Sequence, residues 1–129
     1  MTEQEWMERF EEATLPNGSF HHADHVKMAF LYLHRYPPIE ALERFSSALS
    51  RFAAAHGKPE LYNETITWAF LLLIRERMAR ASCDQAWAEF SAANADLLNW
   101  NDNILKRYYQ PETLRSGLAK RVFLFPDKL

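Results

Sequence analysis

One stretch, residues 61–81 with the sequence LYNETITWAFLLLIRERMARA, constrains the fold of this chain more than any other. Its middle, residues 68–74, is apolar at every position. A helix of this kind has no polar face, so neighbouring elements must surround it. The apolar run is far shorter than the roughly 20 residues that cross a bilayer. We therefore predict that residues 61–81 form the central buried helix of a protein core.

The composition favours a single all-α domain. A chain of 129 residues fits one domain, and it is long enough to bury most of its apolar surface without disulfides or metals. Hydrophobic residues make up 48% of the chain and glycine occurs only three times, which is poor material for the many tight turns of an all-β fold. The expected architecture over residues 1–129 is a compact bundle of about five to seven helices.

Charge and cysteine content argue against several classes of function. The formal net charge of −2 lacks the basic excess of proteins that bind nucleic acid. Cys83 is the only cysteine, so neither an intramolecular disulfide nor a cysteine-based zinc site is available. Residues 1–20 carry acidic side chains where a secretory signal would be basic, and no long apolar core follows. We expect a cytoplasmic protein with no nucleic-acid or membrane partner.

Capping residues, prolines and hydrophobic periodicity predict the other elements. The residue before a proline avoids the helical region, so one helix ends before Pro37 and the next begins at Pro38. Capping boxes start further helices at Thr2 and Ser82, and Gly57 ends the helix that begins at Pro38. The expected elements are helices over 2–13, 21–36, 38–56, 61–81, 103–109 and 111–120, a shorter helix carrying Trp87 and Phe90, a turn over 15–19, and an extended tail over 122–127 in a groove between helices.

Polar side chains converge at one end of this bundle. Short connections make successive helices antiparallel, so the second and the central helix begin at the same end. At about 100° per residue, His22 and His25 point inward from the second helix. Asn63 and Thr67 point inward from the central helix, with Glu64 at the edge of their stripe. The two periodicities predict one polar pocket at the N-terminal ends of two parallel helices.

Two histidines three residues apart on a helix are able to hold a metal ion. His22 and His25 would be two ligands, with Glu64 or a residue from the loop after the first helix as a third, and open positions for water and substrate. Zinc, iron and manganese are the metals that fit such a site. The alternative is structural, with His21 or His22 as a helix-entry residue and His25 as a core histidine that is hydrogen-bonded to Thr67 or to a backbone carbonyl.

A third interpretation uses the helix termini themselves. Two helix starts that meet present free N–H groups and partial positive charge, which favours a bound anion or carboxylate. The same field would lower the pKa of His22 and His25. Both would then be neutral imidazoles, suited to act as general bases or as ligands.

These patterns predict a small-molecule-binding protein, with a metal-assisted or acid–base enzyme as its most specific form. His22 and His25 would be the catalytic or metal-binding residues, and Asn63, Glu64 and Thr67 the substrate-binding residues. The expected ligand is a small anionic or carbonyl-containing molecule. The alternative is a non-enzymatic binding or protein-interaction module whose histidine cluster is structural. Exposed aromatic residues would also allow a homodimer.

Other candidate residues have ordinary structural explanations. His34 lies on the outer side of its helix, and His56 lies at a helix C-terminus, where a partly charged imidazole interacts well with the helix dipole. Arg115 and Arg121 either bind an anionic group or remain solvated surface charges. Cys83 is by default a buried or idle thiol, because no histidine lies near it in the sequence.

Three segments of the chain resemble a group of uncharacterised small bacterial proteins that are all-helical. The first is F-x-H-x-x-H at residues 20–25, the second is YNETITW at residues 62–68, and the third is FPD at residues 125–127. In that group a histidine often stands where this chain has Asn63, which would form a three-histidine cluster with His22 and His25. This chain departs from the pattern there. The resemblance implies a pocket at these residues and no particular reaction.

Overall fold

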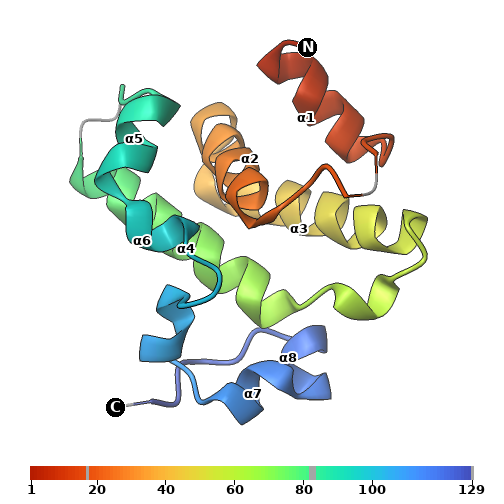
Figure 1. Ribbon diagram of the computed structural model, residues 1–129, viewed down its shortest axis with the longest axis vertical. Helices are drawn as coiled ribbons and strands as arrows, with labels where there is room; N and C mark the ends of the chain where they lie inside the picture. The colour runs from red at the N-terminus through yellow and green to blue at the C-terminus, as the bar shows by residue number, and fades with distance from the viewer. Residues whose placement is uncertain (17, 82–83, 129) are drawn as a thin grey trace.

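The computed structural model describes residues 1–16, 18–81 and 84–128, and all regular structure in them is helical (Figure 1). This confirms the predicted all-α fold. Eight α-helices occur in the described part of the chain, more than the five to seven expected, because its last third is divided into short helices. The elements are α1 (Glu3–Glu11), α2 (His22–Arg35), α3 (Pro38–Ala55), η1 (Pro59–Leu61), α4 (Glu64–Arg80), α5 (Trp87–Ala93), α6 (Ala95–Leu98), η2 (Ile104–Arg107), α7 (Pro111–Arg115) and α8 (Gly117–Arg121), where η marks a 3-10 helix.

Helix α1 ends two residues earlier than its sequence pattern predicts. Thr2 caps its start as expected, accepting a hydrogen bond from the Glu5 N–H at 3.1 Å. Ala13 then adopts a left-handed conformation with a φ of 58°, and the Thr14 N–H donates to the Arg9 carbonyl at 2.8 Å. This arrangement is a Schellman cap, which satisfies the last free carbonyls and stops the helix.

Prolines and glycines set the ends of α2 and α3 as predicted. The residue before Pro37 is extended and ends α2, whereas Pro38 is the first residue of α3. Gly57 follows the C-cap of α3 with a φ of 73°, a conformation that favours glycine. In the turn predicted over 15–19, Gly18 has a φ of 85°, and Asn17 lies outside the described residues.

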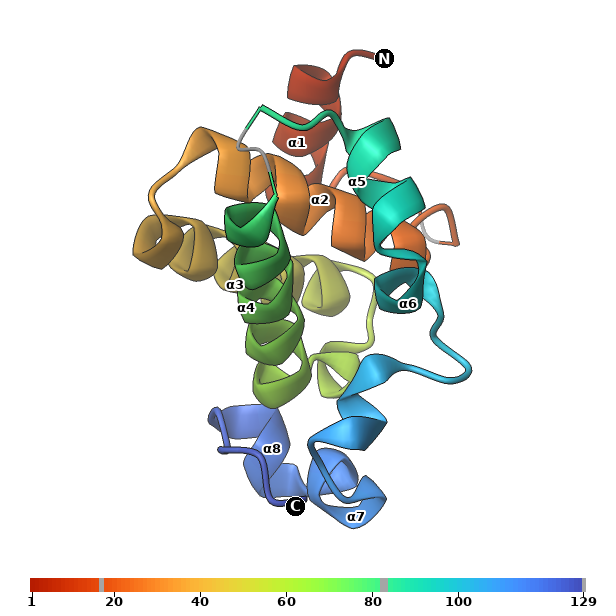
Figure 2. The same cartoon turned by 90° about the vertical axis from the view of Figure 1, so that its left-hand side faces the viewer.

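Helix α4 lies at the centre of the molecule and contacts α2, α3 and α8 (Figures 1 and 2). Leu71 and Ile74 are fully buried in the core. The prediction that neighbours surround the apolar run on every side is wrong at Leu72, which is 43% exposed because no described element covers that side of α4. Neither α4 nor any other helix in the described part of the chain is long and apolar enough to cross a membrane.

The C-terminal third departs most from the predicted boundaries. Helix α5 begins at Trp87 without a side-chain cap, and the predicted cap, Ser82, lies outside the described residues. The helix predicted over 111–120 is divided into α7 and α8. Ser116 is extended there, with a ψ of 152°, and its hydroxyl accepts a hydrogen bond from the Ala119 N–H at 3.1 Å. A serine that caps a new helix start interrupts the helix before it.

The chain ends in an extended tail, as predicted. Thr65, fully buried on α4, donates a hydrogen bond to the Val122 carbonyl at 2.8 Å. The same hydroxyl accepts a hydrogen bond from the Leu124 N–H at 3.1 Å. The Tyr109 hydroxyl donates to the Leu124 carbonyl at 2.7 Å. Two buried hydroxyl groups therefore hold the tail against the rest of the protein.

Replacing Thr65 with valine is expected to lower the free energy of unfolding by about 2 kcal/mol, because a carbonyl and an N–H of the tail lose their partner. Thr65→Ser keeps the hydroxyl and is the matched control, losing only a methyl group worth about 1 kcal/mol. Urea unfolding measures both variants, and limited proteolysis reports release of the tail. Equal losses of stability in the two variants would show that the hydroxyl does not hold the tail.

Candidate functional site

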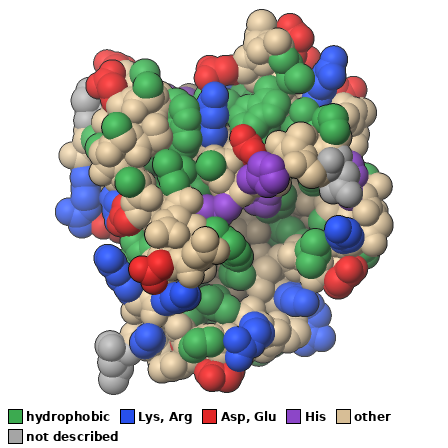
Figure 3. Space-filling model, viewed as in Figure 1, with side chains coloured by type: hydrophobic (Ala, Val, Ile, Leu, Met, Phe, Trp, Pro, Cys, Tyr) green, Lys and Arg blue, Asp and Glu red, His purple; other side chains and the backbone are tan. Residues whose placement is uncertain are grey.

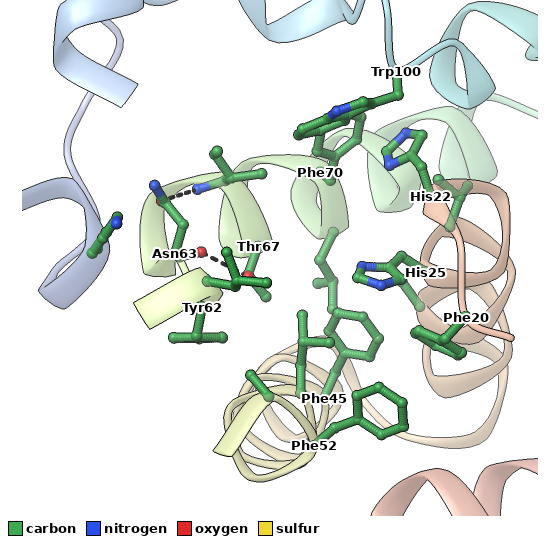
Figure 4. A pocket seen from close by; sticks show the side chains of 18 of the residues that line it. Phe20, His22, His25, Phe45, Phe52, Tyr62, Asn63, Thr67, Phe70 and Trp100 are labelled. Atoms are coloured by element: carbon green, nitrogen blue, oxygen red, sulfur yellow. Dashed lines mark hydrogen bonds between the residues drawn. The ribbon is translucent and has the colours of Figure 1, made fainter. Parts of the chain in front are cut away.

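A cavity of about 720 Å³ lies between α2, α3, α4 and the C-terminal helices. Figure 3 shows histidine side chains gathered on this face of the molecule, and Figure 4 shows the side chains around the cavity. The four polar residues that the sequence predicts to point inward, His22, His25, Asn63 and Thr67, all line it. Most of the wall is apolar, formed by Phe20, Val26, Ala29, Phe45, Leu49, Phe52, Ala53, Leu61, Ile66, Phe70, Leu71, Ile74, Trp100 and Leu114.

His22 is half-buried and has a defined hydrogen-bond partner. Its ring lies 4.8 Å from the Phe70 ring and 5.0 Å from the Trp100 ring, measured between centroids. Its Nε2 lies 2.9 Å from the Leu97 carbonyl. A carbonyl only accepts, so Nε2 carries the proton and Nδ1 is left as an acceptor in the neutral ring. Burial lowers the pKa of His22, although the hydrogen bond to Leu97 opposes this effect.

Helix α6 supplies the carbonyl that binds His22, and an ion pair fixes α6 to the central helix. The Arg77 guanidinium donates to both carboxylate oxygens of Asp96, at 3.1 and 2.9 Å, and to the Asn94 side-chain oxygen at 2.8 Å. This two-point geometry sets direction as well as distance. The hydrogen bonds from Arg77 lower the pKa of Asp96 below its usual value. The position of Leu97 next to His22 therefore depends on Arg77.

His25 is the more buried of the two predicted histidines. Its ring packs on Phe20 with 4.5 Å between the centroids. Burial, together with smaller contributions from the nearby rings of His22 and His21, lowers the pKa of His25 to about 4, because each neighbouring ring would add positive charge. His25 is therefore neutral at pH 7. The helix start also contributes a hydrogen bond from the His21 N–H to the Asp24 carboxylate, at 2.9 Å.

Asn63 and Thr67 line the cavity, yet their polar atoms serve the start of α4. The Asn63 Oδ1 accepts a hydrogen bond from the Ile66 N–H at 2.9 Å, which makes Asn63 the N-cap. Its Nδ2 donates to the Leu114 carbonyl at 2.8 Å. The Thr67 hydroxyl donates to the Asn63 carbonyl at 2.7 Å. The structure therefore places Asn63 as a cap that also ties α7 to α4.

Glu64 does not join the histidines. It lies outside the lining of the cavity and borders a separate groove between α3 and α4, together with Trp68. Its carboxylate accepts a hydrogen bond from the Tyr62 hydroxyl. Consecutive residues on a helix point about 100° apart, so Glu64 faces away from the side that Asn63 and Thr67 present to the cavity. Its expected place beside His22 and His25 is therefore corrected.

The donor groups at the cavity differ from a complete metal site. Within residues 1–16, 18–81 and 84–128, no group of three histidine, cysteine, aspartate or glutamate residues is arranged to hold a metal ion. His22 and His25 supply two ligands, whereas catalytic zinc sites use three protein ligands. Metal binding stays a prediction of the sequence, and elemental analysis of protein purified without a histidine tag tests it.

His56 belongs to the cavity and is absent from the sequence-based site. It lies at the C-cap of α3, 4.4 Å from the Phe52 ring between centroids. Its Nε2 is buried and has no hydrogen-bond partner among the described residues. A signal for it exists in the sequence, because Phe45, Leu49, Phe52 and His56 recur at the helical spacing of one face.

The opening of the cavity carries charged side chains. Lys58, Glu60, Arg115 and Lys120 line it, and all four are exposed. Lys58 and Glu60 lie at η1, which ends two residues before Asn63. Arg115 follows Leu114, whose carbonyl is bonded to Asn63, and Lys120 lies on α8, which contacts α4. We name Lys58, Arg115 and Lys120 the cationic mouth. Of these three residues, only Arg115 is among the candidates predicted from the sequence.

Comparisons of the chain with protein-family models, with curated proteins and with solved structures found no match. Residue roles therefore follow from burial, distances and hydrogen-bond partners in the cavity. These describe an apolar chamber with neutral histidines at one end and exposed cations at the other.

Proposed function

We propose that this protein binds a small, largely apolar molecule in the cavity. The observation that carries the proposal is the combination of volume and lining: about 720 Å³, enclosed mainly by aromatic and aliphatic side chains, with a few polar groups that converge on it. Ligand sites of proteins have this size and this composition. Burial of the ligand's apolar surface would supply most of the affinity.

Binding is favoured over acid–base catalysis because of the state of the histidines. An efficient general base has a pKa near the operating pH. The pKa of His25 is about 4, and burial lowers the pKa of His22 as well. Both rings are better suited to give or accept a single hydrogen bond than to take a proton from a substrate. His22 offers Nδ1 for this purpose, because its Nε2 is bonded to the Leu97 carbonyl.

A purely structural role for the histidines accounts for less of the geometry. A structural core histidine is packed and fully hydrogen-bonded. The His56 side chain instead lines the chamber, and its buried Nε2 lacks a partner among the described residues.

Blocking the cavity is expected to weaken binding of a neutral apolar fluorescent probe, phenylnaphthylamine, by about tenfold or more. Ala53→Trp is suitable, because Ala53 is only half-buried and lines the cavity. Ala55→Trp is the matched control, since Ala55 is an exposed residue of α3 that lies outside the lining of this cavity and of the groove beside Glu64. Probe titration followed by fluorescence measures both, and circular dichroism confirms folding. Equal affinities in the two folded variants would place the binding site elsewhere.

A further inference from the structure

We infer that the ligand is an amphipathic monocarboxylate, with its carboxylate at the cationic mouth and its apolar body extending toward the histidines. This inference rests on the proposed function and adds the chemical class of the ligand. Three features carry it: the charge at the opening, the length and lining of the interior, and the neutrality of the histidines at the other end.

The cationic mouth has an excess of positive charge. Lys58, Arg115 and Lys120 contribute three positive charges and Glu60 one negative charge, which leaves a net charge of +2. No ion pair involving any of the three cations occurs among the described residues, where the four ion pairs involve other side chains. Arginine presents a planar fork of donors that matches a carboxylate. Unpaired cations at an opening attract an anion while leaving its charge in contact with water.

The positions of Arg115 and Lys120 are set by hydrogen bonds near the opening. The Leu114 carbonyl accepts from Asn63 at 2.8 Å, which holds the end of α7 at the start of α4. Ser116 caps α8 and turns the chain there. The two cations therefore stand on either side of a fixed turn at the opening, although their side chains are exposed.

The interior suits an elongated apolar body. The N-cap residue of α4, Asn63, lies at the mouth, and Phe70 lies against His22. Phe70 is seven positions after Asn63, a distance of about 10 Å at a helical rise of 1.5 Å per residue. Phe45, Phe52 and other apolar side chains line the space between these ends. A charged group would lose its hydration there without gaining an ionic partner, so the carboxylate stays at the mouth.

The end of the chamber at His22 and His25 selects against a second charge. His22 and His25 are neutral at pH 7, because burial lowers the pKa of both rings. Neutral imidazoles offer single hydrogen bonds and no ionic attraction. A dicarboxylate would have to place one charge among aromatic rings, so a monocarboxylate of the same length binds more tightly.

Calorimetry with octanoate, octanol and octanedioate tests this inference. We expect octanoate to bind the unmodified protein about tenfold more tightly than octanol, since two or three exposed charge interactions amount to roughly this factor. Octanedioate is expected to bind about tenfold more weakly than octanoate. Each methylene added between hexanoate and octanoate should raise the affinity roughly three- to fourfold.

Removing two cations separates charge recognition from apolar burial. In the double variant Arg115→Gln, Lys120→Gln, octanoate should lose about tenfold in affinity while octanol is unchanged. The double variant Arg75→Gln, Arg121→Gln changes the net charge equally, and neither of its residues lines the cavity. Its octanoate affinity should stay within about twofold of the original.

Two results would overturn the inference and leave the proposed function standing: equal affinities of octanoate and octanol, or equal loss in the two double variants. Absence of octanoate and octanol binding would also overturn it. In that case the neutral probe decides about the proposed function, because its binding does not depend on charge. If the unmodified protein and the control variant bind the probe and Ala53→Trp does not, the cavity remains a binding site. If the unmodified protein does not bind the probe, both proposals are removed.

Discussion

Between pH 7 and pH 4 the free energy of unfolding is expected to fall by about 3 kcal/mol because of His25 alone. The pKa of His25 is about 4 in the folded protein, against an ordinary value of 6.5 in the unfolded chain. Between these values the unfolded state binds more protons than the folded state, so acid favours unfolding. The stabilisation is complete above pH 6.5 and is lost as the pH falls to about 4. Burial lowers the pKa of His22 too, which acts in the same direction.

His25→Gln removes this source of pH dependence, because glutamine does not titrate. Urea unfolding at pH 7 and at pH 4 gives the loss of stability for each protein, and the difference between the two losses isolates His25 from the carboxylates. The matched control is His34→Gln, on the same helix but packed against Phe30 outside the cavity. The idea fails if the unmodified protein and His25→Gln lose the same amount of stability on acidification.

Truncating the centre of α4 is expected to have a comparably large effect. Leu71→Ala should lower the free energy of unfolding by about 2 to 5 kcal/mol, because it removes buried methyl groups and leaves space that the core fills only in part. Leu71 is fully buried, whereas its neighbour Leu72 is 43% exposed. Leu72→Ala is therefore the matched control, with the same chemistry one residue further along the same helix. A surface substitution of this kind usually changes stability by less than about 1 kcal/mol.

Urea unfolding followed by circular dichroism measures both leucine variants. An unchanged denaturant slope would show that stability has changed while the folded and unfolded states have not. Similar losses for Leu71→Ala and Leu72→Ala would contradict the burial that separates these two residues. Leu71 also lines the cavity, so Leu71→Ala measures how much a side chain of the cavity wall contributes to the free energy of unfolding.

Sequence rules predicted helix ends best where a single residue with a restricted or unusual backbone conformation starts or stops the helix. Pro38 begins α3, and Gly57 ends it through a positive φ that other residues rarely adopt. The same rules failed at Ala13, where a non-glycine residue took the left-handed position. They also failed at Ser116, whose hydroxyl caps a helix start inside a stretch that reads as one helix.

The candidate site was predictable where helical periodicity alone determines which side chains face inward. His22, His25, Asn63 and Thr67 line one cavity, as their spacing indicates. Glu64 was misplaced because the sequence puts it at the edge of the inward stripe, one 100° step from Asn63, and such an edge position faces either the cavity or a neighbouring groove. Which of the two it faces depends on how α2, α3 and α8 pack against α4, which no local pattern contains.

The sequence by itself determined the all-α class, the central helix and the two histidines that face inward, because helix formation and amphipathic spacing involve residues a few positions apart. Only the tertiary structure decided what surrounds them. The Leu97 carbonyl that binds His22 is 75 positions away along the chain. Arg115 and Lys120 reach the cavity through a hydrogen bond between Asn63 and Leu114, 51 positions apart. Contacts of this range arise from the packing of whole helices, so the charge of the opening becomes visible only in three dimensions.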